Sequence, residues 1–273
     1  MKTTHQALLP GKSIGVITRI FARAEEDVEH RVSMTMNLLT KIFTLDIAHR
    51  AQVLVPMNPA FADCDCGSTR GALIKALLGK PWAKKVAVTT SKRDDPQGTL
   101  LNYGTARLST DWIWVVAPEA IGILENRDTL AEVSAAAKAD AVAIGFKFPD
   151  LAEATEAGII SNRCAFWQRI PLMEAGGFLS MSDFTLIRRA KELFDDRDIS
   201  GAEEGLTVLR MHHTNPGIRT AILGQGGEYR SPTEQSARDR LAKLAASKVR
   251  RCSTMVDALG GNMSWLRSSL IGV

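Results

Sequence analysis

Apolar residues in the first half of the chain fall into two alternating patterns. In one pattern, short continuous runs rich in β-branched residues stand between turn residues, which is typical of buried strands. These runs are Ser13–Thr18, Gln52–Pro56, Lys85–Thr89, Trp112–Val116 and Ala141–Gly145. In the other pattern, apolar side chains recur at helical spacing, and the helices predicted in this way are Glu25–Phe43, Ala72–Leu78, Thr99–Leu108 and Thr129–Lys138. Strands and helices that alternate at this rhythm predict βαβ units and a mostly parallel sheet.

The carboxyl ends of these strands are the expected position of a binding site. In parallel sheets flanked by helices, ligands bind outside the carboxyl ends of the strands. The loops after Thr18, Pro56, Thr89 and Val116 are therefore candidate walls of a binding site.

The second half of the chain carries a weaker pattern. Short apolar runs predict strands at Gly158–Ser161, Cys164–Trp167 and Thr207–His213. Helical spacing predicts a helix at Asp183–Phe194, and the glycines of Asn215–Gly227 favour a loop.

A capping box marks the start of a last helix. Its residues are Ser231-Pro232-Thr233-Glu234, with proline at the first helical position. The outer face of this helix carries arginines and lysines between residues 238 and 251. We expect one domain of residues 1–230 and a helical extension, residues 231–273, packed on it.

Composition and charge narrow the class of protein. The chain has 273 residues, 45% of them hydrophobic, which suits one large globular domain. Its formal net charge of +4 fits an anionic ligand such as a nucleotide but is too small to indicate nucleic acid by itself. The four cysteines form no C-x-x-C pair, which argues against a zinc ribbon and favours free thiols. The amino-terminal residues have no apolar signal segment and no stretch has the length of a membrane helix, so we expect a cytoplasmic protein.

Two polar segments lie at predicted strand ends. Glu119 follows the strand that ends at Val116; it is either a solvated loop residue or a ligand for Mg²⁺ or Mn²⁺, which would bridge phosphate oxygens. The loop Asp63–Gly71 contains Gly67 and Ser68 just before a helix. It either caps that helix or holds an anion at the helix amino terminus.

Three further features have both a structural and a chemical interpretation. Asp183, at a helix start, is a cap or a general base that removes a proton from an acceptor hydroxyl. His212 and His213 close the predicted strand Thr207–His213, either as one core and one exposed imidazole or as ligands of a metal or phosphate. The basic face of residues 238–251 is solvated surface or a guide for an anionic acceptor.

Taken in order, several segments resemble the GT-A-type glycosyltransferases, especially the inverting, family 2-like enzymes. The segments that carry the resemblance are Asp65–Gly71, Asn102-Tyr103-Gly104, Asp111–Glu119, Glu174-Ala175-Gly176-Gly177-Phe178 and Ser182–Arg189. They look like the acid-rich D-G-S-T-D-G-T loop, the N-x-G helix, the strand that leads into D-x-D, the G-G-F turn and the E-D-x-x-L-x-x-R helix. The resemblance covers roughly Ile14 to Thr214.

The resemblance implies a Rossmann-like GT-A fold, with a mostly parallel central sheet flanked by helices and a C-terminal helical extension. It implies transfer of a sugar, with inversion, from a nucleotide-diphosphate donor such as a UDP-sugar to an acceptor hydroxyl. Asp183 would be the catalytic base and Asp65 would contact the donor base. Glu119 would hold a divalent cation, Mn²⁺ or Mg²⁺, helped by His212 or His213. The donor-binding set is Asp65, Gly67, Ser68, Asn102, Gly104 and Glu119.

The sequence departs from the family pattern at three acids. Ala117 replaces the first acid of D-x-D, Cys66 the second acid of the first loop, and Ser182 the first acid of the E-D pair. These departures leave the need for a metal open. They also favour a degenerate binding or regulatory protein. A nucleotidyltransferase on a similar sheet is a further alternative, although the sequence has no G-x-G-x-x-R-type loop near its amino terminus. The basic helix suggests another alternative, a sugar transferase acting on modified nucleic acid. The acceptor is a glycan, a small molecule or, on the last alternative, modified DNA.

Overall fold

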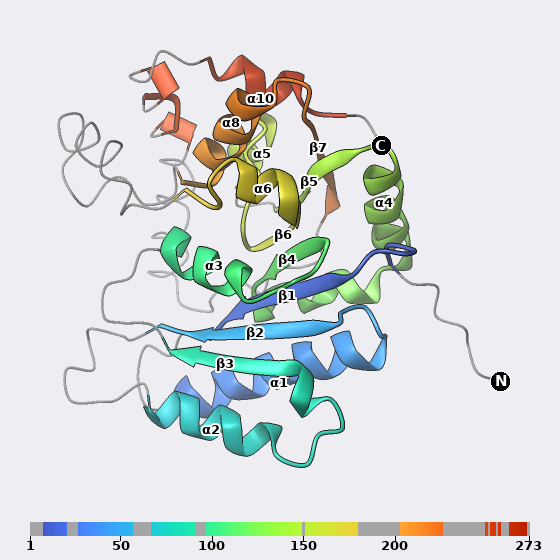
Figure 1. The fold of residues 1–273 in the computed structure, drawn as a ribbon, viewed down its shortest axis with the longest axis vertical. Helices are drawn as coiled ribbons and strands as arrows, with labels where there is room; N and C mark the ends of the chain where they lie inside the picture. Colours follow the sequence, from blue (N-terminus) through green and yellow to red (C-terminus); the bar gives the residue numbers. More distant parts are fainter. Residues whose placement is uncertain are drawn as a thin grey trace.

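A computed structural model describes most of the chain. The described residues are 8–20, 27–56, 67–90, 97–148, 151–179, 203–225, 249–250, 252–254, 256–257 and 262–271. A seven-stranded sheet crosses the molecule in the order β3-β2-β1-β4-β6-β5-β7, with helices packed on both faces (Figure 1). The predicted boundary after residue 230 and the predicted helix Asp183–Phe194 lie outside the described residues.

The first half of the chain forms the predicted βαβ units. The strands are β1 (Ile14–Arg19), β2 (Arg50–Val55), β3 (Val86–Thr90) and β4 (Trp112–Val116). β2 pairs in parallel with β1 and β3, and β1 pairs in parallel with β4. The helices between them are α1 (Asp27–Thr44), α2 (Gly67–Leu77), the short 3-10 helix η1 (Ala83–Lys85) and α3 (Gln97–Ala106). The sequence therefore predicted every strand and every longer helix of this half, with shifts only at their ends.

The second half completes the sheet with one reversed strand. After β4 come the 3-10 helix η2 (Pro118–Glu125), α4 (Arg127–Lys138), β5 (Ala141–Lys147), α5 (Ala152–Glu156) and β6 (Cys164–Gln168). The remaining described elements are α6 (Arg169–Glu174), α8 (Glu203–Thr214), β7 (Arg219–Gln225) and α10 (Ser264–Ser268). β6 is antiparallel to both β4 and β5, whereas β7 is parallel to β5. The sheet is thus mixed but mostly parallel.

Three predictions for the second half are wrong. Thr207–His213 is not a strand but part of helix α8, and the predicted loop Asn215–Gly227 contains strand β7. Gly158–Ser161 forms no strand. In α8, residues 205–209 are all buried, and this run of consecutive buried positions imitates a strand.

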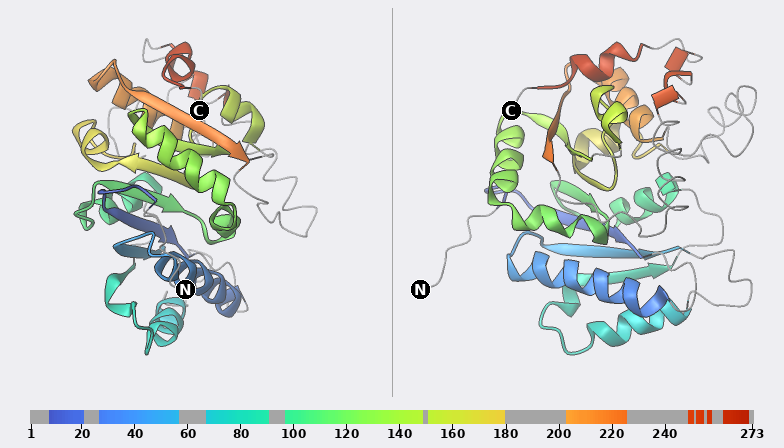
Figure 2. Two further views of the ribbon diagram at one scale, coloured as in Figure 1. Left: turned by 90° about the vertical axis from the view of Figure 1, so that its right-hand side faces the viewer. Right: turned by 180° about the vertical axis from the view of Figure 1, so that it is seen from behind.

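The helices form two layers, one on each face of the sheet (Figures 1 and 2). α1 packs against α2 and η2, and η2 packs against α4, so these four elements share one face. α3, α6 and α8 lie on the other face, together with α5 and α10. Gly104 of α3 lies against Ile17, which points to this second face. The layers matter for the site, because elements of different layers meet only at the edges of the sheet.

A cluster of buried aromatic side chains packs on the face of the sheet that α1 covers. Trp114 stacks on Phe166 with 4.9 Å between the ring centroids, and its Nε1 donates a hydrogen bond to Cys164 Sγ at 3.2 Å. Burial raises the pKa of the Cys164 thiol to about 12. Cys164 and Cys252 are buried and form no disulfide, in agreement with the predicted thiols, while Cys64 and Cys66 lie outside the described residues.

A carboxylate ties the amino ends of β1 and β4 together. Asp111 Oδ2 accepts hydrogen bonds from the Ser13 backbone N–H at 2.7 Å and from the Ser13 hydroxyl at 2.8 Å. These two bonds lower the pKa of Asp111 below its ordinary value, with the backbone bond as the larger cause. The charged form of Asp111 therefore stabilises the folded chain.

Replacing this aspartate should lower stability in a pH-dependent way. We expect Asp111→Asn to reduce the free energy of unfolding at pH 7 by about 1 kcal/mol, because charge-assisted hydrogen bonds become weaker. A carboxyl group with a lowered folded-state pKa stabilises above its unfolded value and loses that contribution as pH falls through its folded value. The difference between wild type and Asp111→Asn should therefore shrink below about pH 4. Urea unfolding at pH 7 and pH 3 checks this, with the exposed Asp46→Asn as control; an unchanged difference at pH 3 contradicts it.

Candidate active site

The candidate site lies at the carboxyl ends of β1, β2 and β4, which share one edge of the sheet because these strands are parallel. Two of the predicted site residues, Asp65 and Asp183, lie outside the described residues. The others, Gly67, Ser68, Asn102, Gly104, Glu119, His212 and His213, are described and are taken in turn below.

Glu119 lies just beyond β4 and is already paired. Pro118 begins η2 immediately after the strand, and Glu119 stands in its first turn. Its Oε1 accepts a hydrogen bond from Nη1 of Arg31, in α1, at 2.5 Å. The two side chains are 18% and 28% exposed, so water screens this ion pair less than it would a fully exposed pair. No local pattern indicates Arg31 as the partner, since 88 positions separate the two residues.

Gly67 and Ser68 open a helix. α2 begins at Gly67, and Ser68 is exposed in its first turn. The first amides of a helix have no partner within it and form a natural anion site. The predicted role of this segment in donor binding is compatible with that position and stays a prediction.

Asn102 joins two segments that the sequence had predicted separately. Its Oδ1 accepts a hydrogen bond from the Phe178 backbone N–H at 2.6 Å, and its Nδ2 donates one to the Phe178 carbonyl at 2.7 Å. The amide thus satisfies both backbone groups of a residue 76 positions away. We call this pair of bonds the Asn102 clasp. It holds the N-x-G helix against the G-G-F turn.

Two glycines allow the close approach that the clasp needs. A Cβ on Gly177 would lie 2.4 Å from Asn102 Oδ1, and its φ of +80° is a conformation that favours glycine. A Cβ on Gly104 would lie 3.0 Å from the Ile17 side chain of β1. Gly104 therefore sets how closely α3 packs on the sheet, and Gly177 sets how closely the turn packs on α3.

Helix α8 holds the same turn from the other side. Arg210 Nη2 donates a hydrogen bond to the Gly177 carbonyl at 2.5 Å, and Thr207 Oγ1 accepts one from the Leu179 N–H at 2.9 Å. Phe178 packs edge-on against the buried Trp167 of β6. Sequence reasoning missed Thr207 and Arg210, because it read their segment as a strand. On a helix their three-residue spacing places both on one face.

The two histidines do not stand at a strand end, contrary to the prediction. Both lie in the last turn of α8, where His212 stacks on Trp265 of α10 at 5.4 Å and His213 is exposed. α8 and η2 cover opposite faces of the sheet, so the histidines and Glu119 come from different layers. Within the described part of the chain, no group of three or more His, Cys, Asp or Glu side chains could hold a metal ion. The described residues therefore do not form the metal site that the resemblance implied.

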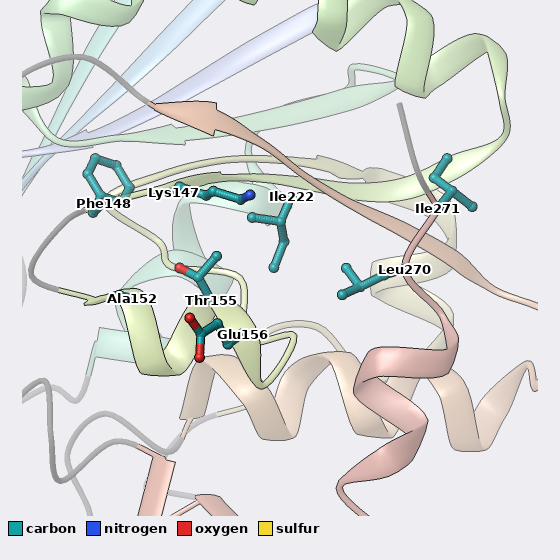
Figure 3. A pocket seen from close by; sticks show the side chains of 8 residues that line it. All are labelled: Lys147, Phe148, Ala152, Thr155, Glu156, Ile222, Leu270 and Ile271. Carbon is teal, nitrogen blue, oxygen red and sulfur yellow. The ribbon is translucent and has the colours of Figure 1, made fainter.

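A separate hollow of about 420 Å³ lies on the α5 side of the sheet, near β7 (Figure 3). It is lined by Lys147, Phe148, Ala152, Thr155, Glu156, Ile222, Leu270 and Ile271. None of the predicted site residues is among these, so this hollow is distinct from the candidate active site.

Comparison with known proteins identifies the fold. No protein-family model matches the chain, and no curated protein matches it. The architecture, a mixed and mostly parallel seven-stranded sheet between helical layers, is the Rossmann-like fold of the GT-A-type nucleotide-sugar transferases. One solved structure of this fold is the mannosyltransferase PcManGT from Pyrobaculum calidifontis, in complex with GDP-Man and Mn²⁺. It superposes with a TM-score of 0.53 and 13% sequence identity over 93% of this chain and 76% of that one.

Two further solved structures match the chain at lower similarity. Glucosyl-3-phosphoglycerate synthase from Mycobacterium tuberculosis has a TM-score of 0.47, with 14% identity over 89% of this chain and 81% of that one. Mannosyl-3-phosphoglycerate synthase from Rubrobacter xylanophilus has a TM-score of 0.45, with 11% identity over 92% of this chain and 76% of that one.

A search of the described helices for a membrane-spanning segment found none with the necessary length and apolar character.

Proposed function

We propose that the protein is a glycosyltransferase that moves a sugar from a nucleotide-diphosphate donor to an acceptor hydroxyl, with inversion at the anomeric carbon. The observation that carries this proposal is the Asn102 clasp on a GT-A fold. It joins Asn102-Tyr103-Gly104, the segment that resembles the donor-side helix, to Gly176-Gly177-Phe178, the segment that resembles the acceptor-side turn. The bonded residues lie 76 positions apart in the sequence, and contact between the two motifs is what a shared site requires.

The proposed reaction needs one base and one means of stabilising the leaving group. The acceptor oxygen forms a bond to the anomeric carbon while the bond from that carbon to the diphosphate oxygen breaks. The acceptor proton passes to Asp183, which acts as general base. Asp65 contacts the nucleotide base, and the first turn of α2, at Gly67 and Ser68, supplies amides to the diphosphate. UDP-sugars are the donors that the resemblance favours.

A binding or regulatory protein that has lost the chemistry is the second candidate. It is favoured by Ala117 and Ser182, which stand where acids are expected, and by the engagement of Glu119 with Arg31. This candidate predicts donor binding without turnover, so binding and turnover have to be measured separately.

Binding is tested by thermal unfolding in the presence of nucleotide-sugars, with and without Mn²⁺. UDP-glucose, UDP-galactose, UDP-N-acetylglucosamine and GDP-mannose form the panel, with the free sugars as controls. A donor at a hundred times its dissociation constant stabilises the folded state by about 2.7 kcal/mol, which raises the melting temperature by roughly 5 °C or more in a chain of this size. We expect such a shift with at least one nucleotide-sugar and none with the free sugars. No shift with any nucleotide-sugar would remove the donor site from the proposal.

A further inference from the structure

The contacts around Glu119 do not suit a divalent cation. Glu119 is the acid that remains in Ala117-Pro118-Glu119, and Arg31 already occupies its carboxylate. The described residues offer no cluster of ligands to complete a metal site, and the histidines lie across the sheet. A cation on Glu119 would have to share the carboxylate with the guanidinium of Arg31, which already bonds to Oε1.

Such sharing would be unfavourable. A divalent cation on the Glu119 carboxylate would stand close to the guanidinium that Oε1 already binds. Two charges of like sign at such a separation repel strongly in a partly buried setting. Arg31 and a cation therefore compete for the same carboxylate.

Arg31 has the properties of a residue that holds phosphate. It lies in the second turn of α1, near the end that faces the carboxyl edge of the sheet, and Glu119 fixes its guanidinium just beyond β4. Its Nη1 is used by Glu119, whereas its buried Nε has no partner among the described residues. An arginine keeps its charge at all relevant pH values, and its planar donors match phosphate oxygens.

We propose that Arg31, oriented by Glu119, neutralises the diphosphate of the donor, and that donor binding by this chain does not need a divalent cation. This inference rests on the proposed function, because it concerns the same donor. Glu119 becomes a positioning residue in place of a metal ligand.

The chain supplies a matched control for Arg31. Lys41 of α1 donates to Glu125 of η2 at 2.6 Å, so a second ion pair joins the same two elements. Ten residues further along α1, it lies about 15 Å from Arg31 along the helix axis. Lys41→Gln removes a similar α1–η2 contact without touching the strand ends.

The test is calorimetric titration of the wild-type chain with UDP and with GDP, once with excess EDTA and once with excess MnCl₂. We expect the better of the two nucleotides to bind with affinities that differ by less than about twofold between the two conditions. Arg31→Gln should weaken this binding by about 10-fold to 100-fold in both conditions, which is the usual loss of a charge-assisted hydrogen bond to phosphate. Lys41→Gln should change it by less than about twofold. Circular dichroism checks that each variant is folded, and Arg31→Lys, which keeps the charge, should lose less than Arg31→Gln.

The outcomes separate this inference from the proposed function. If Mn²⁺ strengthens wild-type binding tenfold or more, or if Arg31→Gln binds as well as Lys41→Gln, Arg31 does not replace the cation, while the donor site stands. If neither UDP, GDP nor any nucleotide-sugar binds in either condition, the proposed function is wrong and this inference falls with it. If Arg31→Gln does not fold, the wild-type titrations still decide whether donor binding needs a cation, and Arg31→Lys tests the guanidinium.

Discussion

Gly177→Ala is expected to lower the free energy of unfolding by about 3 kcal/mol, and Gly176→Ala by about 1 kcal/mol. Both glycines have positive φ angles, +80° and +87°, so both variants carry the strain of an L-residue in that region. Only at Gly177 does the new Cβ collide with a neighbour, 2.4 Å from Asn102 Oδ1. At Gly176 the nearest atom, in Arg210, is 3.5 Å away, which is ordinary contact.

The comparison isolates the clasp because the two glycines are adjacent and have similar φ angles. To relieve the collision, Asn102 must move, and both of its hydrogen bonds to Phe178 are then weakened. Chemical denaturation of both variants and the wild type gives the two differences. Equal destabilisation by the two alanines would mean that the turn does not depend on its fit to Asn102.

The second large effect is expected at Asp183. Under the proposed function, Asp183→Asn removes the general base and should reduce kcat for sugar transfer by about 10²-fold to 10⁴-fold. Donor binding should change by less than about twofold, because an amide has the size of the carboxyl group and the base acts on the acceptor.

Glu174→Gln is the control for this experiment. Glu174 is exposed at the end of α6, a few residues before the G-G-F turn, and its replacement should leave kcat unchanged. Initial rates of nucleoside-diphosphate release by the three proteins check the prediction. Asp183→Asn with wild-type turnover would show that another group takes the proton.

The sequence was informative where one physical pattern dominated. β1 and β4 are buried on both faces and read as continuous apolar runs, and α1 carries one clean apolar face, so all three were predicted almost to the residue. The prediction for α8 was wrong because its five consecutive buried positions, 205–209, look like a strand in the sequence. The prediction for β7 was wrong because glycines stand just before the strand, at Gly217, and near its end, at Gly224. They favoured a loop over the short apolar run between them.

The sequence predicted several residues of the candidate site but not the contacts between them. Asn102 and the Gly176-Gly177-Phe178 turn were both marked from local motifs, yet nothing local shows that an amide on one will satisfy the backbone of the other. The pairing of Arg31 with Glu119 is of the same kind. Long-range polar contacts of this type are set by the packing of whole elements, here α1 on η2 and α3 against the Gly176-Gly177-Phe178 turn, which a sequence pattern does not encode.

The most direct test of the account is turnover. The nucleotide-sugar that binds best in the thermal panel is incubated with the chain and pools of hydroxyl acceptors, and nucleoside diphosphate and glycosylated product are measured together by mass spectrometry. The account predicts that both appear in equal amounts with the wild type and that both nearly vanish with Asp183→Asn. Tight donor binding with no release of nucleoside diphosphate in any acceptor pool, DNA included, would contradict it and identify a binding protein on a transferase fold.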